Sequence, residues 1–340
     1  MRQGGGTGRG GGTRWGGLPF FLRHNRAPLL AAATFAAMFG LYLAMQTRGV
    51  TAGLLVTASN KGVLLALIAI AQTLPVLTGG IDLSVGTIVV LTNCLASNLV
   101  SGPPSQVALG VAGVLACGLA AGCVNALAVV AGRLQPIVAT LATSSVFYGL
   151  ALLLRPDPGG DVSDGFASAM TETLPGGVPT TLALLAAVLA LVWAPLRRSV
   201  TGRALYAVGS SENSAYMSGL RVGRARATAY VLGGLFAGMA GLLLTLIAES
   251  AQASMIQAGD LTLNSIAAVV VGGTSLFGGL GGAIGSVFGA FILRTIGDLL
   301  FVLDAPPLWQ PLFQGLILLA AISLGALPLL RVRNRLELYW

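Results

Sequence analysis

Asp82 is a carboxylate placed inside a long apolar stretch of the sequence. The segment Gly62–Leu77 before it and the segment Ile88–Val100 after it are almost wholly apolar. A charged side chain is costly in such surroundings, so it has a partner, caps a helix or lies beside a water-filled path. As a cap, the carboxylate would accept from free backbone N–H groups near Ser84 and Val85, at the start of the next helix. The two roles are compatible, and the sequence leaves both open.

Neutral polar residues inside the other apolar segments are further candidates to line a solute path. Amides and hydroxyls donate and accept hydrogen bonds without carrying charge, which suits an uncharged polyol such as a sugar better than an ion. The same groups bond between membrane helices, at about 0.6 kcal/mol on average, and for any single residue that is the simpler interpretation. Together with the charged Asp82, the candidate path residues are Gln72, Asn93, Asn125, Thr140, Thr143 and Asn264.

No residue pattern typical of an enzyme or a metal site is present in the sequence. There is no Ser/His/Asp arrangement, and the single histidine, His24, lies among arginines. Cys94, Cys117 and Cys123 fall inside apolar segments without metal-ligand spacing, so we interpret them as small hydrophobic residues. No glycine-rich loop ends in GKS or GKT, so the chain has no P-loop of its own. We expect no catalytic residue, no metal and no cofactor, and no ATP hydrolysis by this chain.

The composition predicts an integral membrane protein. The chain has 340 residues, of which 55% are hydrophobic and only 9% are charged, whereas soluble proteins carry roughly 25% charged residues. It also contains 48 glycines, and small residues let membrane helices approach closely. The net charge of +8 does not indicate nucleic-acid binding, because the positions of the basic residues account for it.

Ten apolar segments predict an all-α, polytopic membrane domain over residues 27–330, since a spanning helix needs about 20 apolar residues. The second and eighth are short and end in glycine-rich turns. The expected spans are Ala27–Met45, Gly62–Leu77, Leu83–Val100, Val107–Ala131, Ile137–Leu154, Thr180–Leu196, Thr228–Ile247, Leu261–Leu276, Gly282–Leu303 and Leu308–Leu330. We expect residues 1–26 to form a disordered, basic cytoplasmic tail and residues 331–340 a second cytoplasmic tail.

The basic residues predict the orientation of the chain. With the N-terminus in the cytoplasm and ten spans, 15 of the 19 basic residues lie on the inside, as the positive-inside rule requires. The even number of spans also returns the C-terminus to the cytoplasm. The four remaining basic residues are Arg48, Lys61, Arg155 and Arg294. Arg294 lies four residues before Asp298, and we expect the two to pair on one helix face.

Two segments between spans are candidates for contact with partners. Residues 155–179 would form an acidic outside loop, which is either simply solvated or part of a docking surface for an external solute-binding protein. Residues 197–226 form the longest polar stretch between spans and fall on the cytoplasmic side. We expect this second segment to be either a contact for a cytoplasmic subunit or an ordinary basic loop.

The cytoplasmic segment has signals for a short capped helix. It contains glycines at Gly202, Gly209, Gly219 and Gly223. We expect them to break the segment into pieces too short to form a domain. Ser211 and its neighbours can cap a helix that runs through Tyr216 to Ser218, and Gly219 is well placed as the residue after its end.

Three motifs resemble those of permease subunits of bacterial ABC importers for simple sugars, in the branch that carries ribose, xylose and galactose. They are TGGIDLSVG at 78–86, GGTSLFGG at 272–279 and GRALYAVGSSENSAYMSGL at 202–220. The resemblance covers nearly the whole chain from the second span onward. Its signature glycines are Gly79, Gly80, Gly86, Gly272, Gly273, Gly278 and Gly279.

The resemblance implies that the third motif couples the permease to an ATPase. The positions that match the family's loop are Gly202, Arg203, Gly209, Asn213, Ala215, Ser218 and Gly219. Tyr216 stands where a second small residue is usual, and Leu220 stands where isoleucine is usual. The resemblance further implies a multi-pass protein of the bacterial inner membrane whose partners are an ATP-binding cassette ATPase, an extracytoplasmic solute-binding protein, a second permease copy or a paralogue, and membrane lipid, but not nucleic acid.

Other functions remain open at this point. The same architecture could import branched-chain amino acids or nucleosides, although GGIDLSVG favours sugars. A self-sufficient secondary transporter usually has several membrane-embedded acids or bases, and here Asp82 is nearly alone. A membrane enzyme lacks support because no reactive cluster is present. The two glycine-rich breaks lie in opposite halves of the chain, which is a weak indication of the paired repeats found in transporters.

Overall fold

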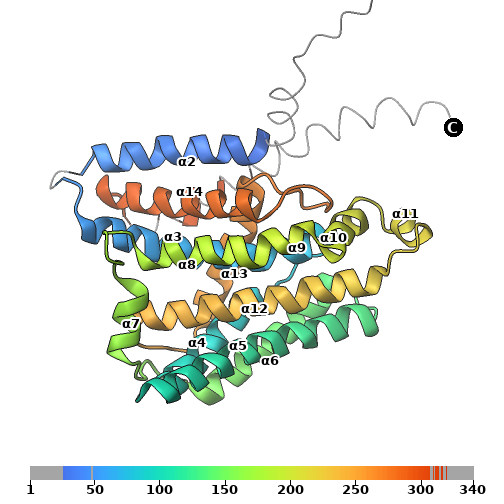
Figure 1. The fold of residues 1–340 in the computed structure, drawn as a ribbon, viewed down its shortest axis with the longest axis horizontal. Helices are drawn as coiled ribbons and strands as arrows, with labels where there is room; N and C mark the ends of the chain where they lie inside the picture. The colour runs from blue at the N-terminus through green and yellow to red at the C-terminus, as the bar shows by residue number, and fades with distance from the viewer. Residues whose placement is uncertain are drawn as a thin grey trace, which may run out of the picture.

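The computed structural model describes residues 26–46 and 49–306, together with residues 309, 311–313, 315, 316 and 319. In this part of the chain the protein is built from helices that lie side by side in an elongated bundle (Figure 1), with two isolated β-bridges and no strand. The prediction of an all-α protein is confirmed. The expected terminal tails and most of the expected tenth span, Leu308–Leu330, lie outside the described residues.

Seven helices of the described residues are long and apolar enough to cross a membrane. They are α2 (Arg26–Ala44), α3 (Ala52–Leu77), α5 (Pro104–Ala126) continued by the π-turn η1 (Leu127–Ala131), α6 (Pro136–Leu154), α8 (Thr180–Val188) continued by η2 (Leu189–Trp193) and α9 (Ala194–Arg198), α12 (Val222–Ala248), and α14 (Ala283–Val302). Two shorter apolar helices, α4 (Val85–Leu99) and α13 (Met255–Val271), complete the bundle. Together they match the first nine expected spans, so the chain is a polytopic membrane protein.

Helix α3 begins well before the expected second span. It starts at Ala52, where the Thr51 hydroxyl accepts a hydrogen bond from the Leu54 N–H at 3.2 Å. The sequence pattern indicated a start at Gly62 because polar residues precede it. In the structure the Asn60 amide is satisfied by other segments: it donates to the Thr171 carbonyl at 2.8 Å and accepts from Thr181 at 2.9 Å. These tertiary contacts let the helix continue through a polar stretch.

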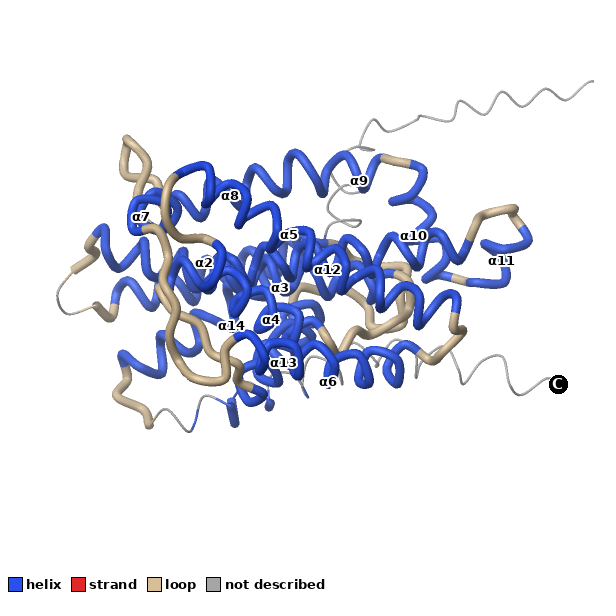
Figure 2. The backbone as a smooth tube through the Cα atoms, turned by 90° about the horizontal axis from the view of Figure 1, so that it is seen from below, coloured by secondary structure: helices blue, strands red, loops and turns tan. Residues whose placement is uncertain are grey.

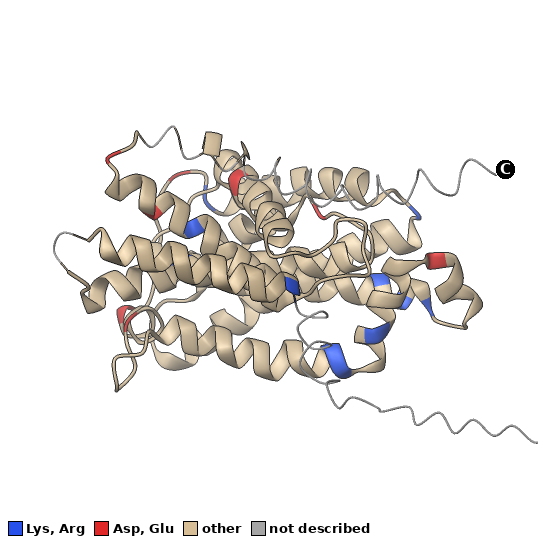
Figure 3. Cartoon of the chain, turned by 90° about the horizontal axis from the view of Figure 1, so that it is seen from above, with Lys and Arg blue, Asp and Glu red and all other residues tan. Residues whose placement is uncertain are grey.

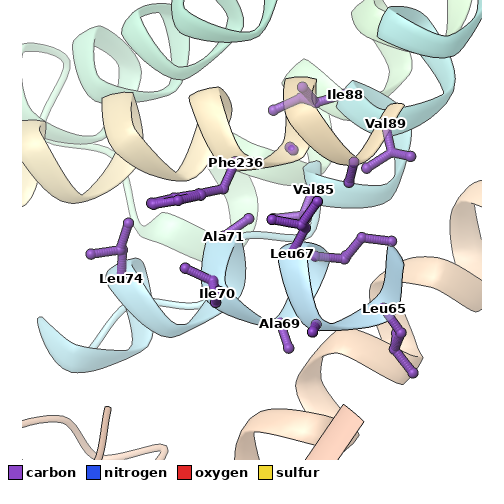
Figure 4. Packing of buried hydrophobic residues seen from close by; sticks show 14 of the residues in the cluster. Leu65, Leu67, Ala69, Ile70, Ala71, Leu74, Val85, Ile88, Val89 and Phe236 are labelled. Atoms are coloured by element: carbon purple, nitrogen blue, oxygen red, sulfur yellow. The ribbon is translucent and has the colours of Figure 1, made fainter. Parts of the chain in front are cut away.

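The core of the bundle surrounds α3, most of whose residues are fully buried. Figure 4 shows Leu67 and Ala71 of α3 facing Val85 of α4 and Phe236 of α12. Helices α12, α14 and α13 all pack against α3. The C-terminal end of this central helix is therefore positioned by most of the fold.

Helices α5 and α12 touch through their backbones. A Cβ atom built on Gly234 would overlap the Gly118 carbonyl oxygen, and one on Gly122 would lie 2.5 Å from the Tyr230 carbonyl oxygen. Only glycine allows so close an approach, and small residues at such positions are typical of packing between membrane helices.

The two ends of the bundle differ in structure and charge. At one end α7 (Asp164–Thr171) crosses the ends of other helices and buries Ala167 against Val100 and Leu246. At the other end lie α10 (Val200–Ser210) and α11 (Glu212–Met217) (Figure 2). Basic residues gather at this second end (Figure 3). The expected acidic loop is thus an ordered structure that closes one end of the bundle.

Candidate functional site

The first glycine signature ends α3 and turns the chain into the bundle. Gly79 has a φ of +77°, its N–H donates to Val76 O at 2.9 Å, and the Gly80 N–H donates to Pro75 O at 3.0 Å. This pair of bonds is the Schellman arrangement, in which glycine takes the left-handed conformation directly after a helix. The chain is then free to run inward to Asp82.

The Asp82 carboxylate is held at the start of α4 and by α5. The residue is 1% exposed. Its Oδ1 atom accepts from the Ser84 N–H at 2.8 Å and from the Ser84 hydroxyl at 2.6 Å, just before α4 begins at Val85. Its Oδ2 atom accepts from the Asn125 amide at 3.2 Å. The contact with the Ser84 N–H was expected, but Ser84 is itself the N-cap residue of α4 and no side chain of the described residues caps this helix, so Asp82 braces the turn before α4 and does not cap it. The bond to Asn125 links the carboxylate to a second helix.

Asn125 and Gln72 extend this cluster to further helices. The Asn125 amide nitrogen also donates to the Ser84 hydroxyl at 2.7 Å, and Thr143 of α6 donates to the Asn125 oxygen at 2.6 Å. The Gln72 amide, oriented to satisfy both contacts, donates to Asp82 O at 2.9 Å and accepts from Asp82 N at 3.3 Å. It is fully buried. Gln72 thus binds the backbone of the turn, whereas Asn125 binds its carboxylate.

Thr140 ties the same turn to α6. Its hydroxyl accepts from the Leu83 N–H at 2.9 Å and donates to the Pro136 carbonyl at 2.9 Å. Five of the seven predicted path residues therefore meet around the turn between α3 and α4. We call Gln72, Asp82, Ser84, Asn125, Thr140 and Thr143 the Asp82 cluster.

The Asp82 cluster is a network of neutral donors around one carboxylate. No cation pairs with Asp82 within the described part of the chain, and no group of residues there could hold a metal ion. The polar atoms of this network bond mainly to one another. The network can hold an irregular backbone segment inside a membrane, where polar groups must be satisfied by protein.

Asn93 and Asn264 do not belong to the Asp82 cluster. Asn93 is 4% exposed on α4, and its side-chain oxygen has no hydrogen-bond partner among the described residues. Asn264 is half-buried on α13. A role for these two residues in a solute path stays a prediction.

A cavity of about 400 Å³ lies away from the cluster, between α2, α3, α8 and α14. Phe35, Phe39 and Phe288 contribute to its apolar lining. At its edge Arg294 and Asp298 pair at 3.9 Å, as expected. None of the predicted path residues lines it.

The second glycine signature ends α13 in the same way as the first ends α3. Gly273 has a φ of +81° and donates to Val270 O at 2.9 Å, while the Thr274 N–H donates to Val269 O at 3.0 Å. Farther along, the Gly279 N–H donates to the Leu77 carbonyl at 3.1 Å. The two signatures therefore meet directly, at the end of α3.

The glycines Gly202, Gly209 and Gly223 do not break the cytoplasmic segment, contrary to expectation. The first two lie inside α10 and the third lies inside α12. Gly202 and Gly209 are instead points of close approach, since a Cβ atom would overlap the carbonyl oxygens of Leu196 and Leu77 respectively. The close contact at Gly209 thus places α10 against Leu77 and Gly279, where the two signatures meet.

The short helix α11 has the expected caps. The Ser211 hydroxyl accepts from the Ser214 N–H at 3.3 Å, and Gly219 follows the helix with a φ of +76°. The Leu220 N–H closes the end by donating to Ala215 O at 3.1 Å. The sequence therefore predicted this helix and both of its ends correctly.

The two faces of α11 have different surroundings. Ala215 is 4% exposed and faces the protein's own core, whereas Tyr216 and Met217 are 74% and 86% exposed. Glu212 forms two hydrogen bonds with the Arg226 guanidinium, at 2.9 and 2.7 Å. Tyr216 and Met217 were not among the predicted coupling residues, and the signal that could have found them is their apolar character in a polar segment.

Of the other expected coupling residues, Arg203, Asn213 and Ser218 are exposed. Tyr206 of α10 donates from its hydroxyl to the Gly281 carbonyl at 2.9 Å. Burial raises the pKa of Tyr206, and the nearby Arg197 opposes this only in part. The hydroxyl therefore stays a proton donor that links α10 to the second signature.

Tyr230 of α12 is a further residue that sequence reasoning missed. It is 1% exposed, and its hydroxyl lies where a Cβ atom on Gly80 would be only 2.6 Å away. A lone tyrosine in a Gly- and Ala-rich span was the available signal.

Comparison with known proteins places these features in a family. Residues 54–322 match the family described as branched-chain amino acid transport system / permease component. The ribose import permease protein RbsC of Haemophilus influenzae is 34% identical over 263 residues, which cover 76% of this chain and 80% of that protein. RbsC of Bacillus subtilis is 36% identical, with the same two shares. The autoinducer 2 import system permease protein LsrC of an Enterobacter species is 35% identical over 89% of this chain and 86% of its own length.

No solved structure matches the chain. The apolar helices and the family match make it a multi-pass protein of the bacterial inner membrane. The family match covers well over half of the chain and contains both glycine signatures, the Asp82 cluster and α11. The chain therefore belongs to the family of permease components described for branched-chain amino acid transport systems.

Proposed function

We propose that this chain is the permease subunit of an ATP-driven importer and forms the path of a simple sugar across the inner membrane. The observation that carries the choice of substrate is the similarity to relatives named for ribose import and for autoinducer 2 import. A separate ATP-binding cassette subunit supplies the energy, and an extracytoplasmic binding protein delivers the sugar.

The orientation we propose has both termini in the cytoplasm and ten spans. It is supported by the basic residues that gather at the end with α10 and α11 (Figure 3), because cytoplasmic ends of membrane proteins are enriched in Lys and Arg. A cysteine placed at Asp161, before α7, is then labelled from outside intact cells, and one at Ser211 is not. Labelling at Ser211 would contradict the orientation.

The docking surface we propose for the ATPase is the exposed side of α11. Exposed apolar residues such as Tyr216 and Met217 on an otherwise polar end mark a site of protein contact. The matching loop positions from Gly202 to Gly219 then seat this helix on the permease. A second permease copy, identical or paralogous, completes the assembly.

The Asp82 cluster acts, in this proposal, as the support of the break between α3 and α4. Its polar atoms are largely satisfied by each other, so it shapes the path more than it binds the solute. Asp82 holds this break together through its bonds to Ser84 and Asn125.

Uptake into proteoliposomes that contain the permease, its ATPase and its binding protein tests the proposal. Labelled D-ribose should accumulate only with ATP on the ATPase side. The family description favours branched-chain amino acids as the second candidate cargo, so L-leucine is the matched alternative substrate. Uptake of ribose by the permease alone, driven by a proton or sodium gradient, would instead establish a secondary transporter.

A further inference from the structure

The Tyr230 hydroxyl is buried and makes no hydrogen bond within the described part of the chain. Buried hydroxyl groups are nearly always paired, so an unpaired one calls for an explanation. The ring is well held, because it packs against Ala126, Val129 and Ala139 of α5, η1 and α6. The hydroxyl is therefore kept in place at some cost to stability.

The hydroxyl faces the break between α3 and α4. A Cβ atom on Gly80 would lie 2.6 Å from the Tyr230 oxygen and 3.5 Å from the ring of Pro136. A side chain at position 80 would thus occupy the space of the hydroxyl. The first signature needs glycine at this position for the contact with Tyr230, in addition to the helix end that Gly79 provides.

Asp82 is the carboxylate nearest in sequence to this contact. Its Oδ2 atom accepts one bond, from Asn125 at 3.2 Å, and a carboxylate oxygen accepts two. Gly80, which contacts the hydroxyl, lies only two residues before Asp82. The carboxylate has room for a further donor at Oδ2.

Helix α12 also carries the residue that binds α11, Arg226. Arg226 lies one turn before Tyr230, and its guanidinium binds both carboxylate oxygens of Glu212. A displacement of α11 is thus passed to the segment of α12 that bears the Tyr230 ring.

We propose that Tyr230 is a positioning residue of the transport cycle, whose hydroxyl donates to the Asp82 carboxylate in a second conformation of the permease. The inference rests on the proposed function, since it assigns a role in transport. In the conformation described here the bond is unmade. A shift of α12 against the segment 79–84 makes it, and the link from Arg226 to α11 ties that shift to the ATPase.

Replacement of the hydroxyl distinguishes this role from a structural one. The test variant is Tyr230→Phe, and the matched control is Tyr148→Phe, which removes a hydroxyl from a half-buried tyrosine of α6. Each is reconstituted with the ATPase and the binding protein. We expect Tyr230→Phe to keep or raise the thermal midpoint, because it removes an unpaired buried group, and to lower ATP-driven ribose uptake at least about tenfold. The control should match the wild type in both.

A double variant tests the proposed acceptor. In an Asp82→Asn background the amide nitrogen that replaces Oδ2 cannot accept, so adding Tyr230→Phe should lower uptake no further. Additive losses would overturn the pairing with Asp82. Wild-type uptake in Tyr230→Phe, or a loss explained by a lower thermal midpoint, would overturn the positioning role.

ATP hydrolysis in the same vesicles separates this inference from the choice of substrate. If the wild-type complex takes up no ribose, the proposed cargo is wrong. ATP hydrolysis stimulated by the binding protein still measures the rate of the transport cycle. This rate should fall in Tyr230→Phe but not in Tyr148→Phe. Equal hydrolysis by the two variants would refute the role of Tyr230 whatever the cargo.

Discussion

The two glycine-rich breaks end their helices by the same pair of hydrogen bonds but lead to different surroundings. After Gly79 the chain enters the bundle, and Asp82 and Ser84 are buried among side chains of several helices. After Gly273 the chain stays near the surface, where Phe277 and Leu280 are 71% and 70% exposed. The comparison teaches that the helix-ending motif is local, whereas the function of a break depends on what its next residues contact.

The second break has several short-range bonds of its own, besides the bonds of Gly279 to Leu77 and of Tyr206 to Gly281. The Thr274 hydroxyl accepts from the Gly282 N–H at 3.1 Å, and the Ser275 N–H donates to Leu280 O at 3.1 Å. The first break instead depends on Gln72 of α3 itself and on Asn125 and Thr140 from two other helices, α5 and α6. We therefore expect changes at the first break to affect the whole bundle and changes at the second to act more locally.

The largest effect is expected where the two breaks meet. Gly209→Ala places a Cβ atom onto the Leu77 carbonyl oxygen, and because backbone cannot give way easily, we expect a loss of about 3 kcal/mol. The control is Gly149→Ala on α6, which has open space around it. Thermal unfolding of the purified proteins measures both. Equal midpoints would show that the junction is loosely packed.

Removal of the Asp82 carboxylate is expected to have the next largest effect. Asp82→Ala frees the Ser84 and Asn125 donors in a buried site, at a cost of about 1–3 kcal/mol. Asp82→Asn keeps the Oδ1 bonds to Ser84 and should cost less stability than Asp82→Ala. Its amide nitrogen also removes the proposed acceptor of Tyr230, so its uptake should fall about as far as that of Tyr230→Phe. Thermal unfolding of the purified proteins compares the stabilities of the two Asp82 variants, and equal midpoints would show that the Ser84 bonds contribute little.

A matched pair of threonine changes sharpens the contrast between the breaks. Thr140→Val and Thr274→Val each leave one backbone N–H, of Leu83 or Gly282, without its acceptor. We expect each to cost about 1 kcal/mol. Hydrogen exchange should show opening over several helices for Thr140→Val and over residues 272–282 alone for Thr274→Val. The same local pattern in both would remove the distinction.

The smallest effect is expected at the third helix end of this type, after α11. Gly219→Ala meets no neighbouring atom, so its only cost is the left-handed backbone, about 1 kcal/mol. Overall stability should change little, whereas capture of the ATPase should weaken a few-fold. Tyr216→Ala, on the exposed side of α11, should weaken capture with no change in stability. Unchanged capture by both variants would place the ATPase contact elsewhere.

Local signals in the sequence predicted much of this structure. The length of the apolar segments located the nine helices that match the first nine expected spans. Ser211 and Gly219 located both ends of α11, because caps depend on neighbouring residues. The position of Asp82 before an apolar run predicted its bond to the Ser84 N–H for the same reason.

Contacts between distant segments could not be predicted in this way. The start of α3 depends on Asn60 reaching Thr171 and Thr181, which lie more than a hundred residues away. Gly209 appeared to be a helix breaker because its actual neighbour, Leu77, is remote in sequence. The pairing of Asp82 with Asn125 likewise needs the fold, since nothing in the local sequence of either residue indicates the other.

The glycine contact between α5 and α12 has a mechanical consequence. Where backbones touch through Gly118, Gly122 and Gly234, no side chain is present whose rotation could absorb sliding. The two helices should therefore move as one rigid body in any rearrangement of the bundle. Asn125 lies on one of them and Tyr230 on the other, so their mutual spacing should stay fixed in such a rearrangement.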